Sequence, residues 1–228
     1  MAVAPPICYR ILKTRKQVGI GGKWESPDRI HAESLSIAHF CPDSASAPQT
    51  ELKMLYDDEN LYGVFRVHDE YVLCRATEYQ ADVTRDACVS AYFQPKPDMG
   101  YLALDINCCG ALRARYIEEP GGDQAMAPLR IVSLPWKHGH QLRIYTSQFG
   151  TVVPENAGPM TWYVEFVLPF SVVEHYVGPL PTLSEHPWHA NFFKSCSSCS
   201  HPHRASWAPL TGGVSFHQPD CFQPIYFA

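Results

Sequence analysis

CVSAYFQPKPDMGYLALDINCCGALRARYI, residues 88–117, contains three short segments in which apolar side chains occupy every second position. The first segment, Cys88–Gln94, is stopped by a Pro-Lys-Pro turn. The second, Tyr101–Cys108, and the third, Ala111–Ile117, flank a hairpin-like Cys-Gly pair. Period-two alternation is typical of antiparallel strands with one buried and one solvated face. The stretch therefore predicts three neighbouring strands of one sheet.

The same signals recur along the chain, separated by turn residues. Further strands are expected at Glu51–Tyr56, Leu61–His68, Gln141–Ser147, Met160–Leu168, His189–Lys194 and Ile225–Phe227. Residues 1–23 should hold a lead-in strand, and residues 24–48 should be irregular. Phe170–Val177 is the one short helix expected, since Gly178 follows it. Two antiparallel sheets that bury their apolar faces against each other form a β-sandwich, so the fold class is all-β.

Composition narrows the functional classes. The chain has 228 residues, a size suited to one sandwich domain over residues 1–228, and a net charge of -5. Nucleic-acid binding is not expected, because it needs clustered Lys and Arg. The sequence contains no run of about 18 apolar residues, so no membrane span is expected. The opening MAVAPPICYRILKTRKQ lacks the order of a signal peptide. We therefore expect a cytoplasmic protein, or a secreted one whose leader has been removed.

The polar faces of the three central strands form a candidate binding surface. If these strands are neighbours, one outer face carries Ser90, Tyr92, Tyr101, Asp105, Asn107, Arg113 and Arg115. Sugar hydroxyls need paired donors and acceptors, and the C–H faces of pyranose rings stack on aromatic rings. The alternative is an ordinary solvated face on which an Asp/Arg cross-strand pair adds stability.

Several segments in order resemble the family 9 carbohydrate-binding modules and their stand-alone relatives. They are GGKWESPDRI, TELKMLYDDENLYGVFRVHDEYV, RDACVSAYFQPKPDMGYLALDINCCGAL, TWYVEFVLPFSVVEHYVG, WHANFFKSC, SHPHRASWAPL and SFHQPDCFQPIYF. The resemblance implies an immunoglobulin-like, jelly-roll-like β-sandwich. It also implies non-catalytic sugar binding, often at the reducing ends of chains, and association with glycoside hydrolases. Some members hold a structural calcium ion.

The family's sugar contacts map onto this chain only in part. Two tryptophans that sandwich the sugar correspond to Val83 and Phe216, and an acidic residue corresponds to Ser90. An Arg and an Asn on the next strand correspond to Asp105 and Asn107. The ligand-binding candidates are Phe216, His217, Asn107, Asp105, Tyr92, Ser90, Arg113 and Trp207.

A second set of residues could hold a metal. Cys196, Cys199, His201 and His203 lie within eight residues and offer the ligand types of a tetrahedral zinc site. The alternative is a loop held by histidine hydrogen bonds. The nine cysteines of the chain are expected to be mainly small buried hydrophobes rather than a disulfide framework.

Two other interpretations remain open at this stage. A haem- or metal-binding sandwich with a redox or structural role could recruit Met54, Met99, His201 and His203. The oxygen-rich turn over residues 57–60 could bind calcium, although a capped turn explains it as well. An enzyme is not expected, because glycoside hydrolysis needs two carboxyl groups held across a cleft and no spacing in the sequence selects a pair.

Overall fold

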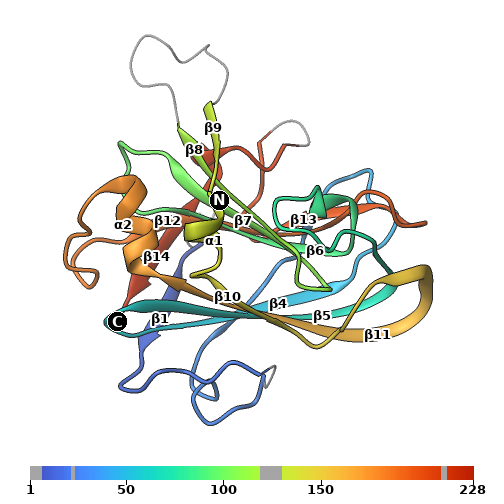
Figure 1. Ribbon diagram of the computed structural model, residues 1–228, viewed down its shortest axis with the longest axis horizontal. Coiled ribbons are helices and arrows are strands. Elements are labelled where there is room, and N and C mark those ends of the chain that lie inside the picture. Colours follow the sequence, from blue (N-terminus) through green and yellow to red (C-terminus); the bar gives the residue numbers. More distant parts are fainter. Residues whose placement is uncertain (1–6, 22–23, 119–129, 212–214) are drawn as a thin grey trace, which may run out of the picture.

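Two β-sheets pack face to face in the computed structural model, which describes residues 7–21, 24–118, 130–211 and 215–228 (Figure 1). Sheet A has the strand order β1-β14-β12-β6-β7-β8-β9, and β13 pairs with both β12 and β3. Sheet B has the order β10-β11-β5-β4-β1, and β2 pairs with β4. The predicted sandwich is confirmed.

The elements follow in chain order. The strands are β1 (Tyr9–Lys13), β2 (Ser34–Ser36), β3 (His39–Phe40), β4 (Gln49–Tyr56), β5 (Asn60–Cys74), β6 (Cys88–Gln94), β7 (Tyr101–Asn107), β8 (Leu112–Glu118), β9 (Arg130–Ser133), β10 (Arg143–Thr146), β11 (Val152–Pro169), β12 (Trp188–Cys196), β13 (His203–Ser206) and β14 (Gln223–Phe227). The helices are α1 (Trp136–Gly139) and α2 (Phe170–Val177), and the 3-10 turns are η1 (Val83–Arg85) and η3 (Pro219–Cys221).

Local sequence signals set several of these boundaries. Strand β6 and helix α2 have the predicted bounds, and α2 ends at Gly178, whose φ of 70° favours glycine. The turn between β7 and β8 likewise uses Gly110, with a φ of 91°. The prediction of one helix was incomplete, because α1 forms a second, single-turn helix. No helix in the described residues is long and apolar enough to cross a membrane.

Strand β1 departs from the expected antiparallel pattern. Its first half pairs in parallel with β14, with Tyr9 opposite Ile225, and its second half pairs in parallel with β4, with Leu12 opposite Leu55. The strand therefore joins the two sheets at one side of the sandwich. Parallel partners are not linked by a hairpin, so no local turn signal marks them in the sequence.

The interior of the sandwich contains the apolar positions that the alternation predicts. Leu102, Leu104 and Ile106 of β7 belong to the central core, together with Phe93 of β6. Sheet B contributes large side chains, among them Phe166, whose ring centroid lies 6.2 Å from that of Phe93. Burial of this apolar surface is the main stabilising term of the fold.

The opposite face of sheet A is not the solvated surface that the sequence predicts. Tyr92, Tyr101 and Asp105 are buried there. The aromatic rings form a second cluster with Phe193 and Phe222, against which Leu210 and Phe216 pack. The chain that follows β13 thus covers much of this face, a long-range packing that period-two alternation cannot reveal.

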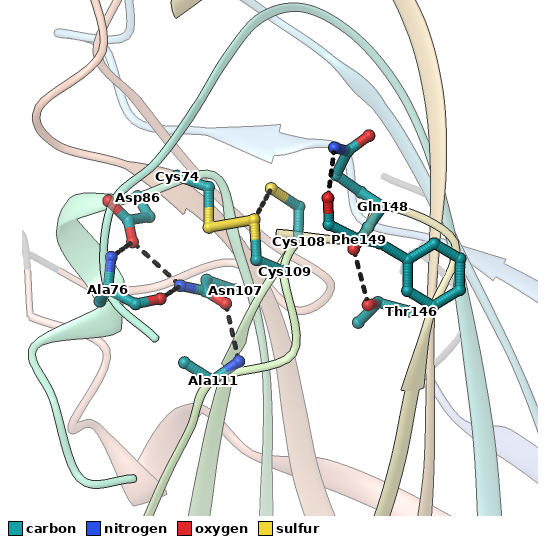
Figure 2. The surroundings of a disulfide bond; sticks show 10 residues. All are labelled: Cys74, Ala76, Asp86, Asn107, Cys108, Cys109, Ala111, Thr146, Gln148 and Phe149. Atoms are coloured by element: carbon teal, nitrogen blue, oxygen red, sulfur yellow. Dashed lines mark hydrogen bonds between the residues drawn. A yellow bond between two sulfur atoms is a disulfide. The ribbon is translucent and has the colours of Figure 1, made fainter. Parts of the chain in front are cut away.

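A disulfide links the end of β5 to the turn between β7 and β8 (Figure 2). Cys74 and Cys109 have Cα atoms 6.5 Å apart, and Cys108 lies beside them, with its sulfur 3.8 Å from that of Cys109. The other seven cysteines are free, and five of them are buried, as expected of small hydrophobes. Disulfides persist mainly in oxidising compartments. The cytoplasmic location expected from the sequence stays a prediction.

Reduction should therefore destabilise the fold measurably. The cross-link closes a loop with a sequence separation of 35, for which loop entropy gives about 3–4 kcal/mol of stabilisation. We expect a reductant to lower the free energy of unfolding by up to this amount in the wild-type protein, as measured by urea denaturation. The double variant Cys74→Ser/Cys109→Ser should show no reductant effect. Equal thiol titres in denaturant before and after reduction would show that the bond does not form.

Candidate functional site

A pocket of about 210 Å³ lies on the outer face of sheet A. Strands β6, β8, β12 and β13 contribute to it, together with the turn η1 and the segment before η3. Its lining residues are Thr84, Tyr92, Arg113, Arg115, Ser195, Ser197, Arg204, Phe216 and His217.

Asp105 organises the sheet surface next to this pocket. The carboxylate is completely buried, and each of its oxygens accepts two hydrogen bonds. Oδ1 accepts from the hydroxyls of Ser90 at 2.7 Å and Tyr92 at 3.1 Å. Oδ2 accepts from Arg113 Nε at 3.1 Å and Arg115 Nη2 at 2.8 Å. A buried charge persists only with this degree of pairing, so Asp105 holds its neighbours in place and offers no free oxygen to a ligand.

Arg113 and Arg115 differ in the number of their hydrogen-bond and ion-pair partners. Arg113 also pairs with Asp82 at 2.7 Å and donates to Thr84 Oγ1 at 3.2 Å. Arg115 has one hydrogen-bond partner in the described structure, Asp105. Its Nε is buried without a partner, and so is Oγ of Ser195. Buried polar atoms are nearly always hydrogen-bonded, so these two atoms are exceptions in the wall beneath the pocket, and the accessible part of Arg115 is the remainder of its guanidinium.

The aromatic side of the pocket consists of Phe216 and His217. The Phe216 ring stacks on Phe193, with centroids 4.2 Å apart. His217 Nδ1 lies 2.7 Å from the hydroxyl of Tyr101, and its ring stacks on Tyr92. Burial and then the positive charge of Arg115 lower the pKa of His217 to about 4. The imidazole is therefore neutral at pH 7.

The structure brings some of the sequence candidates together and separates others. Phe216, His217, Tyr92 and Arg113 line one pocket. Ser90 and Asp105, expected to contact sugar hydroxyls, are buried and bonded to each other.

Asn107 and Trp207 lie outside the pocket. Asn107 donates to Asp86 and to the carbonyl of Ala76, and it accepts from the amide of Ala111 (Figure 2). These bonds fix the β7–β8 turn. Trp207 belongs to the central core, where it packs on Phe192. Both were expected to bind the ligand. Instead, the Asn107 amide is used in hydrogen bonds within the protein and the Trp207 ring is packed in the core.

The ligand-binding candidates did not include five of the lining residues, which are Thr84, Arg115, Ser195, Ser197 and Arg204. Arg115 was placed on the candidate binding face with Arg113 but was not chosen as a ligand-binding residue. The others come from η1, β12, β13 and the residue that follows β12, and they meet only in the fold. Val83, expected at one of the tryptophan positions, is completely buried. Its neighbour Thr84 lines the pocket instead, so a hydroxyl stands on the side where the family's second aromatic ring is expected.

The predicted zinc set does not assemble. The only three-ligand group of His, Cys, Asp or Glu among the described residues is Cys74, Cys108 and Cys109, two of which form the disulfide. His203 Nε2 lies 2.7 Å from the Lys194 ammonium, and its Nδ1 lies 2.8 Å from Ser46 Oγ. An ammonium can only donate, so Nε2 is the acceptor and Nδ1 carries the proton. The alternative of a loop held by histidine hydrogen bonds describes His203.

The same contacts remove support for a haem site. His203 has no free ring nitrogen, the His201 ring stacks on Tyr71 at 3.7 Å, and Met54 is buried in the core. The proposed calcium turn does not fit either. Asp57 accepts from the amides of Glu59 and Asn60 and from the Tyr62 hydroxyl, which is the capped-turn alternative.

Comparison with known proteins agrees with this architecture. The sequence profile of carbohydrate-binding family 9 matches residues 28–227. The chain belongs to carbohydrate-binding family 9. A search of curated proteins found no significant match.

Solved structures of family 9 and related proteins share the fold. A candidate carbohydrate-binding protein from Bacteroides uniformis has a TM-score of 0.83 at 20% identity, over 97% of this chain and 99% of that one. A family 9 module from Caldicellulosiruptor kristjanssonii, in complex with glucose, has a TM-score of 0.63 at 15% identity, over 96% and 95%. Its cellotriose complex has a TM-score of 0.65 at 14% identity, over 97% and 93%.

Removal of the Asp105 charge should be strongly destabilising. In Asp105→Asn, two largely buried guanidiniums lose their shared counter-charge, and we expect a loss of about 3 kcal/mol or more in the free energy of unfolding. The matched control is Asp82→Asn, which removes the other carboxylate paired with Arg113. Its side chain is 58% exposed, so the loss should stay below about 1 kcal/mol. Comparable losses in urea denaturation would contradict the organising role of Asp105.

The low pKa of His217 predicts a pH-dependent stability term. The folded-state pKa of about 4 lies below the ordinary histidine value of 6.5, so the unfolded chain binds the proton more tightly. The term is fully present above pH 6.5 and is lost as the pH falls towards 4. The difference in stability between wild type and His217→Gln should change by about 1–2 kcal/mol across this range. A constant difference in urea midpoints would show that His217 is not buried near Arg115.

Proposed function

We propose that this protein binds a saccharide in the pocket on the outer face of sheet A and has no catalytic role there. The observation that carries the proposal is the combination of the Phe216 ring with the partly exposed guanidinium of Arg115, which has one hydrogen-bond partner in the described structure. An aromatic ring beside converging polar groups suits a pyranose, which is apolar on its C–H faces and polar at its rim. Family membership supports the same function.

The volume favours one sugar residue over a long chain segment. Pockets for drug-sized ligands measure about 300–1,000 Å³, whereas this pocket measures about 210 Å³. A terminal residue of an oligosaccharide would fill it, with the rest of the chain outside. We therefore propose recognition of chain ends, the mode that the family resemblance implies.

The chemistry of the lining does not provide for glycoside hydrolysis. That reaction uses two carboxyl groups flanking the scissile bond, and in the part of the chain that the structure describes no residue lining the pocket carries one. Asp105 is close, but all four of its hydrogen-bonding positions are taken. Binding without turnover is the function that this arrangement supports.

Calorimetry with neutral and acidic mono- and oligosaccharides tests the proposal. We expect saturable binding that Phe216→Ala weakens about tenfold or more, because the ring that stacks on the sugar is lost. Trp136→Ala is the matched control, since Trp136 is a 65% exposed aromatic residue on α1, outside this pocket. Absence of heat with every saccharide would overturn the proposal, and a loss confined to Trp136→Ala would place the site elsewhere.

The biological ligand follows from the family resemblance as a further part of the proposal. We propose that the bound end belongs to a polysaccharide under breakdown by a glycoside hydrolase. Retention on insoluble polysaccharides, before and after chain ends are chemically reduced, tests this. Loss of retention after reduction is expected, and unchanged retention would exclude recognition of reducing ends.

A further inference from the structure

The lining of the pocket contains an excess of cationic donors. Arg113, Arg115 and Arg204 lie on it, and no Asp or Glu of the described residues does. A guanidinium has five N–H donors and cannot accept a hydrogen bond. The side-chain acceptors on the lining are the hydroxyl oxygens of serine, threonine and tyrosine and one ring nitrogen of the neutral His217. A neutral sugar presents many hydroxyl donors and would find few strong acceptors here.

The charge balance points the same way. Asp105 is one buried carboxylate shared by two guanidiniums, whose side chains are 18% and 13% exposed. Two further carboxylates, Asp82 beside Arg113 and Asp43 beside Arg204, balance the formal charge but are more than half exposed, so water screens them more than it screens the buried Asp105. The less screened charge beside the pocket is therefore that of the guanidiniums, which favours an anionic ligand.

The histidine of the pocket is neutral. His217 is held against Tyr101 and Tyr92, and its pKa is lowered by burial and then by the positive charge of Arg115, against the opposing effect of Asp105. It therefore adds no further cation, but presents a neutral ring edge beside Phe216. The aromatic side suits a sugar ring, and the arginine side suits a carboxylate.

We infer that the preferred ligand is an acidic sugar, with a terminal uronic acid as the class that fits these observations. The carboxylate would accept hydrogen bonds from Arg115, whose guanidinium has one hydrogen-bond partner in the described structure. Planar guanidinium–carboxylate pairing gives strong and directional recognition. The inference rests on the proposed function, because it names the ligand class of the same pocket.

Calorimetry at neutral pH with glucuronate, glucose, glucose 6-phosphate and acetate tests the inference on the wild-type protein. We expect glucuronate to bind about tenfold more tightly than glucose at low ionic strength, and the ratio to fall as salt is added. Arg115→Gln should bring the ratio close to one, while Arg115→Lys should keep part of it. Arg143→Gln, on strand β10 of sheet B, is the matched control and should leave it unchanged.

Each other outcome has a defined meaning. Equal or tighter binding of glucose overturns the inference and leaves saccharide binding intact. Tighter binding of glucose 6-phosphate assigns the pocket to phosphorylated sugars, and acetate as tight as glucuronate shows a general anion site, and both overturn the inference. No binding of any saccharide removes the proposed function as well. The wild-type ratio and its salt dependence decide the question even if Arg115→Gln fails to fold.

Discussion

The buried carboxylate of Asp105 is the constraint on which the outer face of sheet A depends. A fully buried charge is tolerated only when every lone pair has a donor, and four side chains on β6 and β8 supply those donors. Meeting that requirement fixes the rotamers of Tyr92, Arg113 and Arg115 at once. Three of the residues that line the pocket are therefore positioned by one interaction, before any ligand contributes.

The covering segment completes the pocket from the other side. Phe222 and Leu210 seal the aromatic cluster on the outer face, while Phe216 packs on its edge and remains part of the lining. The pocket thus lies where the apolar cover gives way to the arginine-bearing strands. Its two chemical characters, one aromatic and one cationic, result from this boundary.

Local pattern revealed the sheets but not what covers them. Alternation along Tyr101–Asn107 predicts which side chains face inward, because the period of a strand is two whatever its surroundings. Whether the other face meets water depends on a segment about one hundred residues away, and alternation is silent on that contact. Tyr92 and Arg113 were found from alternation, Phe216 from the resemblance to family 9 and His217 as its neighbour in the loop, whereas Ser195 and Ser197, which meet them only in the folded chain, were not found.

A second buried ionic cluster shows what distinguishes the pocket. Lys194 pairs with Asp69 at 3.1 Å, and both side chains are fully buried. Burial opposes ionisation of Asp69, but the Lys194 charge holds the pKa of that carboxyl below its usual value. His203 Nε2 is the next partner of Lys194, so this ion pair is enclosed within the core. At Asp105 two cations share one buried anion beside a pocket, and the second carboxylate of this group, Asp82, is 58% exposed. Similar residue types thus serve the fold in one place, whereas in the other they place weakly screened guanidiniums where a ligand can reach them.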